Sequence, residues 1–509
     1  MSFSPRVPRS TSILRRMSPD EVFGLRTMGL TEIYGRGDLV VLGLGVMIGA
    51  GIFSIAGRQA ATTAGPGVFL SFMIAGITSL LAALCYAELV SSMPVSGSAY
   101  TFSYVVFGEV WAWIVGWALI LEMELAAAVV ARAWSLYAVQ TLTEFGVSLP
   151  GLITGAGGFD PLSMVILVAL TGAMAFNARV GLRVLWVMVA AKLLAIGAVI
   201  VVGAVHFDAA NLARIPAPVA PSPGGGDALH TTLVGLVIGE THSFGWFGII
   251  AAAPAIAFAY IGFDVVATAA EETKDAPRAV PDGMIRSLAL TTLIYLAVAV
   301  VMVGMVAYTA ISTKAPLADA FDRVGEGFMV HVINVGAVLG LTTVILVLLV
   351  GQTRVVFSMA RDGLLPHGLS RLSGPHATPL TATLVIGAVA VLLAGFLPVL
   401  TLEQLVIIGT MVAFMSVAAG VLRMRRMLPD LPRPFRVPFA PVVPALSMAA
   451  TLWLMVNLEA LTWVYFTLWT AFGLLVYLLY GRRHSLLAPN APNASNTPHA
   501  PHGRGRHRR

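Results

Sequence analysis

A few ionisable residues lie inside apolar stretches of this chain, and they are the first candidates for chemistry. Lys192 stands nine residues beyond Arg183 in the run 183–205, which is about 13 Å further along a helix that rises 1.5 Å per residue. A buried amine is costly in its charged form, so it can release and rebind a proton. We therefore interpret Lys192 as a candidate for proton coupling, with a structural lysine as the alternative.

Three further ionisable residues interrupt the apolar run 104–138, namely Glu122, Glu124 and Arg132. Glu122 is a candidate second protonation site, and a carboxyl group held neutral or hydrogen-bonded between helices is an equal alternative. Arg132 is expected to pair with a carboxylate or with backbone carbonyls. For Glu124 the sequence assigns no role.

The run 39–60 should position such groups, yet it carries Gly49, Ala50 and Gly51 at its centre. Glycine in a helix interior costs about 1 kcal/mol relative to alanine. In hydrocarbon, each backbone group freed by a break must also find a partner inside the protein. The pattern predicts a broken helix, although Gly45 and Gly49 form a small-xxx-small pair that can serve close packing alone.

A second interruption occurs in the run 247–271, where Pro254, Gly262 and Asp264 fall within eleven residues. Proline removes a helical hydrogen bond, and a carboxyl group at membrane depth marks a functional position. The two interrupted runs are five spans apart, which predicts two five-helix halves of opposite orientation with a substrate held where the breaks meet. Freed amides at a half-helix N-terminus attract a carboxylate and freed carbonyls hold an ammonium, so a zwitterionic amino acid fits both.

The composition places these runs in a polytopic membrane protein. Of 509 residues, 58% are hydrophobic and 11% are charged, against about 25% charged in a soluble domain. A helix needs about 20 apolar residues to cross a bilayer. Twelve runs qualify: 39–60, 67–92, 104–138, 161–178, 183–205, 247–271, 285–311, 328–359, 379–396, 401–425, 441–458 and 460–481.

The arginines and lysines set the predicted orientation. They gather before the first run, in alternate loops and after the last run, whereas the other loops offer only Arg214, Lys314 and Arg323. Both termini are therefore predicted to be cytoplasmic, in a plasma (inner) membrane, and the net charge of +6 indicates topology instead of nucleic-acid binding. The expected organisation is a cytoplasmic segment 1–37, a twelve-helix transporter domain 38–482 and a disordered basic cytoplasmic tail 483–509. Within the domain we expect repeat one at 38–205, repeat two at 247–425 and extra helices at 441–481.

Several function classes are excluded. The single cysteine, Cys85, excludes a disulfide framework and a cysteine metal site. The chain has no Gly-Lys pair, hence no Walker A loop for ATP, and no His-Glu-x-x-His metal motif. Gly43 and Gly45 resemble part of a dinucleotide fingerprint, but Ile48 occupies the third glycine position. We expect no catalytic residues, no metal and no cofactor, with a proton gradient as the energy source.

Several separate stretches resemble a known family. They are Gly-Val-Met-Ile-Gly-Ala-Gly-Ile-Phe at 45–53, Ala-Gly-Pro at 64–66, Cys-Tyr-Ala-Glu-Leu at 85–89, Pro-Val-Ser-Gly-Ser-Ala-Tyr at 94–100, Phe-Ala-Tyr-Ile-Gly-Phe-Asp at 258–264, Glu-Glu-Thr-Lys-Asp-Ala-Pro-Arg at 271–278, and Gly-Gln-Thr-Arg with Arg-Asp-Gly-Leu-Leu-Pro within 351–366. Together they resemble the amino acid, polyamine and organocation transporter superfamily, in particular the cationic amino acid transporter group and its bacterial relatives, over residues 35–480.

The resemblance implies an all-α membrane protein with a LeuT-like core of ten helices in two inverted repeats, plus two peripheral helices. It places the substrate carboxylate against Gly49, Ala50 and Gly51, with Phe258 as a gate. The amine would face the carbonyl of Met47 or Ile48 on the first span and the carbonyls of Phe258, Ala259 and Ile261 on the sixth. In proton-coupled members a lysine on the fifth span replaces a sodium ion, which assigns that role to Lys192. One departure is Ala50, where relatives often carry a hydroxyl residue.

Substrate choice is expected to depend on the eighth span, where Leu348 and Gly351 approach the breaks. Because Leu348 would exclude a long cationic side chain, we expect a proton-coupled symporter of neutral, small to medium L-amino acids. An exchanger of amino acids or polyamines, a carrier of cationic amino acids and a nontransporting sensor stay open as alternatives. The sequence does not indicate whether a partner subunit is needed.

Overall fold

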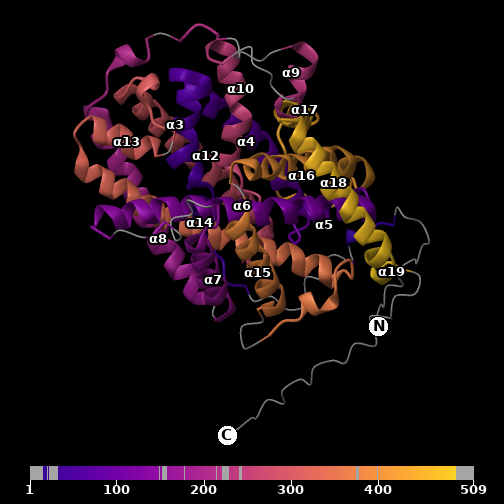
Figure 1. Ribbon diagram of the computed structural model, residues 1–509. Helices are drawn as coiled ribbons and strands as arrows, with labels where there is room; N and C mark the ends of the chain where they lie inside the picture. Colours follow the sequence, from indigo (N-terminus) through magenta and orange to yellow (C-terminus); the bar gives the residue numbers. More distant parts are fainter. Residues whose placement is uncertain are drawn as a thin grey trace.

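The computed structural model describes residues 15–19, 21, 32–147, 150–151, 158–176, 178–213, 215–219, 228–239, 243–313, 315–373, 378–397 and 399–488. The described part is helical, and its only β structure is four isolated bridges. Figure 1 shows the helices crossing in one body, with α6 and α14 near its centre. The basic tail beyond residue 488, most of segment 1–37 and the loop 220–227 lie outside the described residues.

The first half of the chain begins with an interrupted helix. Its parts are α2 (Arg36–Met47), a π-helical turn (Gly51–Ile55), α3 (Ala56–Gln59) and a second π-helical turn (Ala60–Ala64). The following helices are α4 (Val68–Ser92), α5 (Ala99–Val106), α6 (Glu109–Glu144), α7 (Pro161–Phe176) and α8 (Ala178–Val205). The side chain of Asp38 accepts from the Gly35 amide at 2.8 Å and so caps the N-terminus of α2.

The second half contains the other interrupted helix. A short α9 (Leu233–Ile238) precedes α10 (Gly245–Ala257), a 3-10 turn (Phe258–Tyr260) and α11 (Val265–Thr268). The helices that follow are α12 (Ala276–Met305), α13 (Pro316–Arg323), α14 (Gly327–Arg361), α15 (Leu380–Phe396), α16 (Val399–Met427), α17 (Val442–Val456), α18 (Ala460–Val476) and α19 (Arg482–His484).

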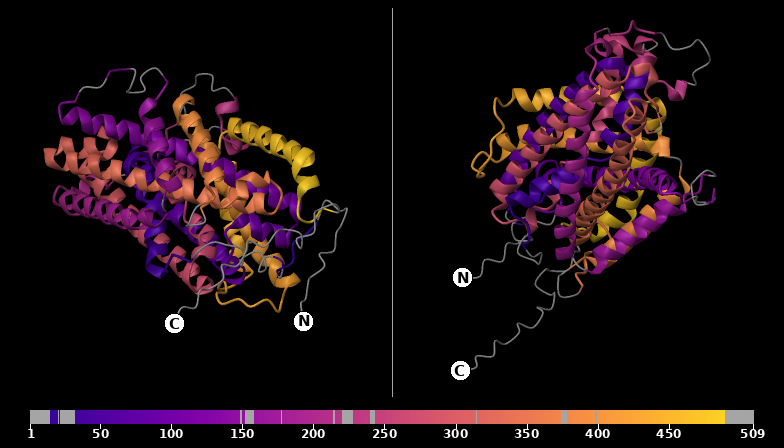
Figure 2. Two further views of the ribbon diagram at one scale, coloured as in Figure 1. Left: turned by 90° about the horizontal axis from the view of Figure 1, so that it is seen from below. Right: turned by 90° about the vertical axis from the view of Figure 1, so that its left-hand side faces the viewer.

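The packing brings both interrupted helices into the interior. The long α6 packs against α14 and α16, while α12 packs against α2 and α4. The two turned views keep these helices within one body (Figure 2). Every apolar run expected from the sequence coincides with a helix in the described part.

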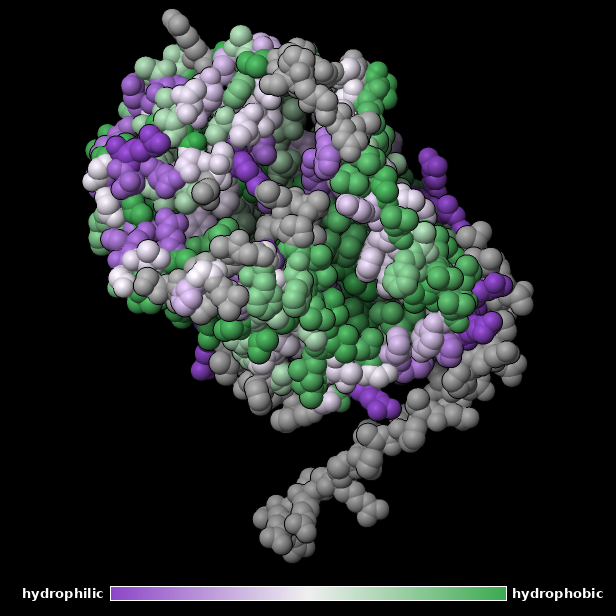
Figure 3. All heavy atoms as spheres, viewed as in Figure 1, coloured by the Kyte–Doolittle hydropathy of each residue, from purple (hydrophilic) through white to green (hydrophobic). Residues whose placement is uncertain are grey.

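Among the residues that the structure describes, eight helical stretches are apolar and long enough to cross a membrane, and the first of them, Arg36–Ser92, contains both α2 and α4. Three shorter apolar helices accompany them: Pro161–Ala175, Leu380–Phe396 and Val442–Val456. The surface in Figure 3 is hydrophobic over its middle and lower part, and hydrophilic residues gather toward its edges. The chain is therefore an all-helical membrane protein with a bent first helix. Twelve spans, the inverted repeat and the side of the termini stay predictions.

Both described ends of the chain lie at one end of the helices, which we call the terminal face. Arg15 pairs there with Glu109 at the start of α6, at 2.8 Å. The amide of Leu486 donates to the carbonyl of Asp362, just past α14, at 3.0 Å. The other end of the helices, called the opposite face, carries the last residue of α6, Glu144, which accepts from His331 at 2.7 Å.

Candidate functional site

The first break lies at Ile48–Ala50. After α2 ends at Met47, Ile48 adopts an extended conformation with ψ 96°. The Gly49 carbonyl then accepts from the amides of Ile52 and Phe53, at 3.2 and 3.4 Å, which starts the next helical turn. Amides that open a helix have no carbonyl one turn earlier. The bent first helix expected from the glycines is confirmed.

The second break begins later than the sequence predicts. Pro254 stays inside α10, which continues to Ala257. Ile261 is extended with ψ 138°, and Gly262 has a φ of +109°, a conformation that side chains disfavour. Proline inside a membrane helix is tolerated where its neighbours satisfy the freed carbonyl. The chain therefore changes direction at Gly262 and not at Pro254.

The two breaks pack directly on each other. A Cβ atom at Gly51 would lie 2.2 Å from the Cβ of Ala259 and 2.6 Å from its Cα, so only glycine fits this contact. A Cβ at Gly262 would lie 2.5 Å from a methyl group of Val46. The glycines at both breaks therefore serve close packing, and their part in substrate binding stays a prediction.

Tyr295 of α12 joins the two breaks, a role that sequence reasoning missed. Its hydroxyl lies 2.5 Å from the carbonyl oxygen of Met47 and 3.1 Å from that of Ala259. The side chain is fully buried. A tyrosine within the apolar run 285–311 carries no signal that separates it from a core aromatic residue.

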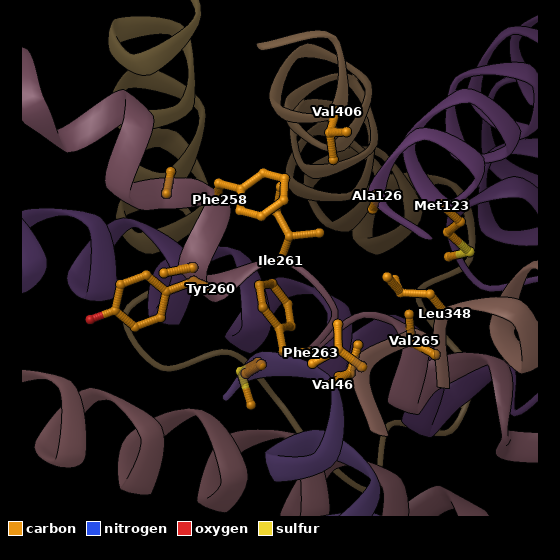
Figure 4. Packing of buried hydrophobic residues seen from close by; sticks show 14 of the residues in the cluster. Val46, Met123, Ala126, Phe258, Tyr260, Ile261, Phe263, Val265, Leu348 and Val406 are labelled. Carbon is orange, nitrogen blue, oxygen red and sulfur yellow. The ribbon is translucent and has the colours of Figure 1, made fainter. Parts of the chain in front are cut away.

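A small pocket lies where the breaks meet, with about 310 Å³ of empty space when the part open to solvent is included. Figure 4 shows Phe258 and Ile261 on one side and Ala126 of α6 and Leu348 of α14 on the other. Seven of the nine predicted substrate-contacting residues line it: Met47, Gly49, Ala50, Gly51, Phe258, Ile261 and Leu348. Val46, Ala126, Val130 and Val344 complete the lining.

Three predicted positions lie outside this lining. The carbonyl of Ile48 accepts from Lys192 at 3.0 Å, and Ala259 packs against Gly51. Gly351, expected beside Leu348, packs against Val265 instead, where a Cβ would lie 2.5 Å from a methyl group. On α14, residues 344 and 348 share a helix face, and residue 351 is turned away from them toward α11.

Lys192 reaches the first break from α8. Its Nζ donates to the carbonyls of Gly45 and Ile48 at 2.9 and 3.0 Å, and to the hydroxyl of Thr343 on α14 at 2.9 Å. The side chain is fully buried. All three hydrogens of a protonated amine thus have acceptors, at the point where α2 stops being a helix.

Glu122 and Asp264 lie beside the second break. The two carboxyl groups are fully buried and interact electrostatically with each other and with the Tyr86 hydroxyl. Within the described part of the chain, no carboxyl oxygen of either residue forms a full hydrogen bond, although the Thr410 hydroxyl lies near Glu122 and the amides of Gly262 and Val265 lie near Asp264. Two ionised carboxylates in this setting would repel each other without compensation.

The other ionisable residues of α6 have partners. Glu124 accepts from the side-chain amide of Gln352 on α14. Arg132 donates to the carbonyls of Ala394 and Gly395 at the end of α15, at 2.6 and 3.0 Å, and to that of Gly158 at 2.6 Å. Of the two kinds of partner expected for Arg132, backbone carbonyls are confirmed, and a cation at a helix C-terminus is favourable.

On the terminal face, buried ion pairs join the segment after α11 to α14. Glu271 accepts from Arg361 at 3.1 Å and from the Ser96 amide at 3.0 Å. Arg354 donates to Glu272 at 2.6 Å and to the Tyr34 hydroxyl at 3.0 Å. Because these groups are largely buried, Glu271 and Glu272 do not form a charged helix end in water.

Backbone hydrogen bonds join the two interrupted helices on the same face. The amides of Ile33 and Tyr34 donate to the Glu272 carbonyl at 2.8 and 3.0 Å, and the Lys274 amide donates to the Tyr34 carbonyl at 3.0 Å. Burial raises the pKa of the Tyr34 hydroxyl, which therefore stays protonated at neutral pH. The segment before α2 and the segment after α11 form one unit.

The opposite face is also held by an ion pair. Arg58 of α3 donates to Glu403 of α16 at 2.6 Å, and both side chains are at least three-quarters buried. Ion pairs between elements that are distant in the sequence thus occur on both faces of the described part.

The comparisons with known proteins agree with this arrangement. The family model for amino acid permeases matches residues 36–480. The chain belongs to this amino acid permease family, whose members are transporters and not enzymes.

Its relatives differ in the compounds named for them. The methylthioribose transporter of Bacillus subtilis is 38% identical over 94% of this chain and 99% of the relative. The branched-chain amino acid permease BcaP of the same organism is also 38% identical, over 94% of this chain and 99% of the relative. Cationic amino acid transporter 4 of Mus musculus is 33% identical over 81% of this chain and 62% of the relative.

Proposed function

We propose that the chain is a proton-coupled symporter of neutral, small to medium L-amino acids, with aliphatic side chains preferred, that works by alternating access. The observation that carries the proposal is the pocket between the two breaks. Its main-chain end lies where one helix ends and the next turn begins, and every side chain that lines it is apolar.

The backbone end suits the common part of an amino acid. The amides of Ala50 and Gly51 open a helix and favour a carboxylate. The carbonyl of Met47, which lines the pocket, lies 2.5 Å from the Tyr295 hydroxyl and accepts its single hydrogen, and a carbonyl has two lone pairs. An ammonium at the pocket can therefore use the second lone pair of Met47.

The side-chain end selects against charge. Ala126, Val130, Val344 and Leu348 offer neither a donor nor an acceptor beyond their backbones. A guanidinium or a second ammonium bound there would lose its water without gaining a partner, at a cost of several kcal/mol. An aliphatic side chain has no polar group whose hydration would be lost. Its burial stabilises the complex by about 25 cal/mol per Å² of apolar surface.

Methylthioribose is the competing substrate, because two relatives of equal identity carry different names. The lining favours the amino acid. The methylthio group is apolar and suits the wall, but the sugar hydroxyls would need polar side chains that the described lining does not contain.

Two groups support proton coupling. The amine of Lys192 has acceptors from the first break for its protonated form. The pair of Glu122 and Asp264 can hold a proton beside the second break, since a proton between two buried carboxyl groups removes their repulsion.

Thermal unfolding of the purified protein with each amino acid tests the substrate class, because a ligand that binds only the folded state raises the melting temperature. We expect valine, leucine, isoleucine and methionine to stabilise, and arginine, lysine, putrescine and methylthioribose to have no effect. Stabilisation by arginine or by methylthioribose alone would overturn the proposed substrate.

Uptake into liposomes tests the coupling. A proton gradient, acidic outside, should drive accumulation of the stabilising amino acid above equilibrium, and a protonophore should abolish it. Exchange of internal for external amino acid that is unaffected by the gradient would identify an exchanger instead.

Leu348 tests the side-chain end. Leu348→Ala should improve relative uptake of larger substrates such as phenylalanine by about tenfold over valine, since one or two methylene groups change selectivity by about 1–3 kcal/mol. Leu349→Ala is the matched control, because Leu349 is equally buried but does not line the pocket.

A further inference from the structure

Two arginines converge on the terminal face without an acidic partner. A nitrogen of Arg16 lies 3.7 Å from the sulfur of Met427, and Nε of Arg423 lies 3.3 Å from the same atom. Within the described segments, neither guanidinium forms an ion pair. A thioether is a weak, neutral acceptor, so two positive charges meet here without compensation.

The position of Arg16 is fixed by its neighbours. Arg15 and Met17 are 6% and 3% exposed, whereas Arg16 between them is exposed. The carbonyl of Arg15 accepts from the Glu109 amide at 2.8 Å, and its side chain pairs with the Glu109 carboxylate. The segment is thus attached to the start of α6, and Arg16 is held on the outer side.

Arg423 is fixed by an aromatic ring. Its guanidinium lies 5.5 Å from the ring centroid of Phe107, between α5 and α6. The ring of Phe107 lies 6.1 Å from that of Trp111, which is 43% exposed and donates to Ser416 of α16. The two arginines therefore lie beside a small apolar surface formed by the rings of Phe107 and Trp111, which we call the apolar shelf. It lies next to α6 and α16, two helices apolar enough to cross a membrane.

Further positive charge surrounds the pair. Arg15 donates to the carbonyl of Arg482 at 2.9 Å, which brings the C-terminal segment beside Arg16. Arg482 and Arg483 are exposed, and neither forms an ion pair with the residues that the structure describes. The segment that carries these two charges therefore adds to the positive charge of this side of the terminal face.

We propose that Arg16 and Arg423 form a binding site for the headgroup of an anionic phospholipid. The two unesterified oxygens of a phosphodiester share one negative charge and accept from two guanidinium groups at once. The shelf of Phe107 and Trp111 takes the glycerol backbone and the first methylene groups, since tryptophan is typical of the boundary between water and hydrocarbon. The apolar shelf distinguishes this lipid from a free phosphate.

Native mass spectrometry of the full chain in detergent tests the site. Phosphatidylglycerol and phosphatidylcholine of equal acyl chains are titrated onto the protein, and inorganic phosphate is added at millimolar concentration as a competitor. We expect at least tenfold tighter binding of phosphatidylglycerol, and no displacement by phosphate. Equal binding of the two lipids, or displacement by inorganic phosphate, would overturn the proposal.

Variants locate the site. Arg16→Gln with Arg423→Gln should reduce the preference for phosphatidylglycerol at least tenfold. Arg278→Gln with Arg371→Gln, two exposed arginines elsewhere without ion pairs in the described part, removes the same charge and should leave the preference intact. Equal losses in both double variants would show a diffuse charge effect and overturn the site.

A third variant separates binding from folding. Arg16→Lys with Arg423→Lys keeps the charge but loses the planar fork, so it should bind phosphatidylglycerol several-fold more weakly than wild type and more tightly than the glutamine variant. All variants should elute as the same monodisperse species. A lysine variant that is folded and binds no better than the glutamine variant would overturn the charge-based recognition.

Discussion

At the first break, the amine of Lys192 donates to three acceptors, two of them carbonyls of the broken helix itself. At the second break, the carboxyl groups of Glu122 and Asp264 interact electrostatically, and their nearest donors, the Thr410 hydroxyl and the amides of Gly262 and Val265, form no full hydrogen bond with them. Both places are fully buried. A broken helix thus provides three full hydrogen bonds for a cation in one place and only weak donors for an anion in the other.

The difference follows from what a broken helix exposes. The last turn of α2 presents carbonyl oxygens, which solvate an ammonium. Asp264 directly precedes α11, and its side chain makes no capping bond to an amide. A buried carboxyl without a donor is stable only with a proton. The comparison therefore predicts that the first break holds a charge and the second holds a proton.

The largest effect is expected at the first break. Lys192→Met leaves the Ile48 carbonyl without its side-chain donor, while the Gly45 carbonyl keeps the bond from Thr343. Because the amine itself is removed, proton-driven accumulation should fall at least tenfold while exchange persists. The measurement is uptake into liposomes with and without a pH gradient. Lys274→Met, an exposed lysine, is the control. Undiminished accumulation in Lys192→Met would end the coupling role.

The bridge between the breaks should show the next largest effect. Tyr295→Phe removes the hydroxyl that lies between the carbonyl oxygens of Met47 and Ala259. The loss of this hydrogen bond costs about 1–3 kcal/mol of folding free energy. Where about 1.4 kcal/mol of this cost applies to the substrate-bound state, the affinity for the substrate weakens by about tenfold. Isothermal titration calorimetry measures this affinity. Tyr465→Phe, at an exposed ring, should be neutral, and an unchanged affinity in Tyr295→Phe would show that the bridge is dispensable.

The second break should respond more gently. Glu122→Gln and Asp264→Asn each replace a carboxyl by an amide of equal shape, so folding stability should stay within about 1 kcal/mol or rise. The response of uptake to the proton gradient should fall about threefold. The comparison is wrong if either amide variant loses much stability, since that would indicate an ionised carboxylate with favourable partners.

A carboxyl group at the terminal face sharpens the comparison, because it has partners. Burial raises the pKa of Asp362 to about 6, although Arg361 and a bond from Tyr100 at 2.7 Å lower it. An unfolded aspartate titrates near 3.9, so the folded chain binds the extra proton between about pH 4 and pH 6. Stability from this group therefore falls as the pH rises through that window and is flat above it.

The expected size is about 1 kcal/mol between pH 5 and pH 7. Melting temperatures at the two pH values measure it, and Asp362→Asn should flatten the difference. An equal slope in wild type and in the variant would show that other groups carry the pH dependence.

Hydropathy and helix-breaking residues made much of this molecule predictable. The apolar runs, the bend at Gly49 and the buried Lys192 all follow from the local sequence. Hydropathy and the helix-breaking effect of glycine depend on the residues at that position and not on distant ones. Pro254 misled the placement of the second break, since a proline inside a packed helix does not always end it.

Contacts that join distant residues could not be predicted. Tyr295 reads as a core aromatic until Met47 and Ala259 meet it, and Glu124 needs Gln352 from another helix. The ion pairs of Glu271 with Arg361 and of Arg58 with Glu403 join elements that are distant in the sequence and packed together in the fold. Such contacts depend on tertiary packing, which a single sequence does not report.

The backbone bonds between Tyr34 and residues 272–274 have a mechanical consequence. They do not depend on side chains, so no single substitution separates the entry of α2 from the exit of α11. Arg354 of α14 donates to both Glu272 and Tyr34, so one side chain attaches this unit to α14. A movement of the unit away from α14 would have to break the bonds of that single arginine, and both half-helices would then move together.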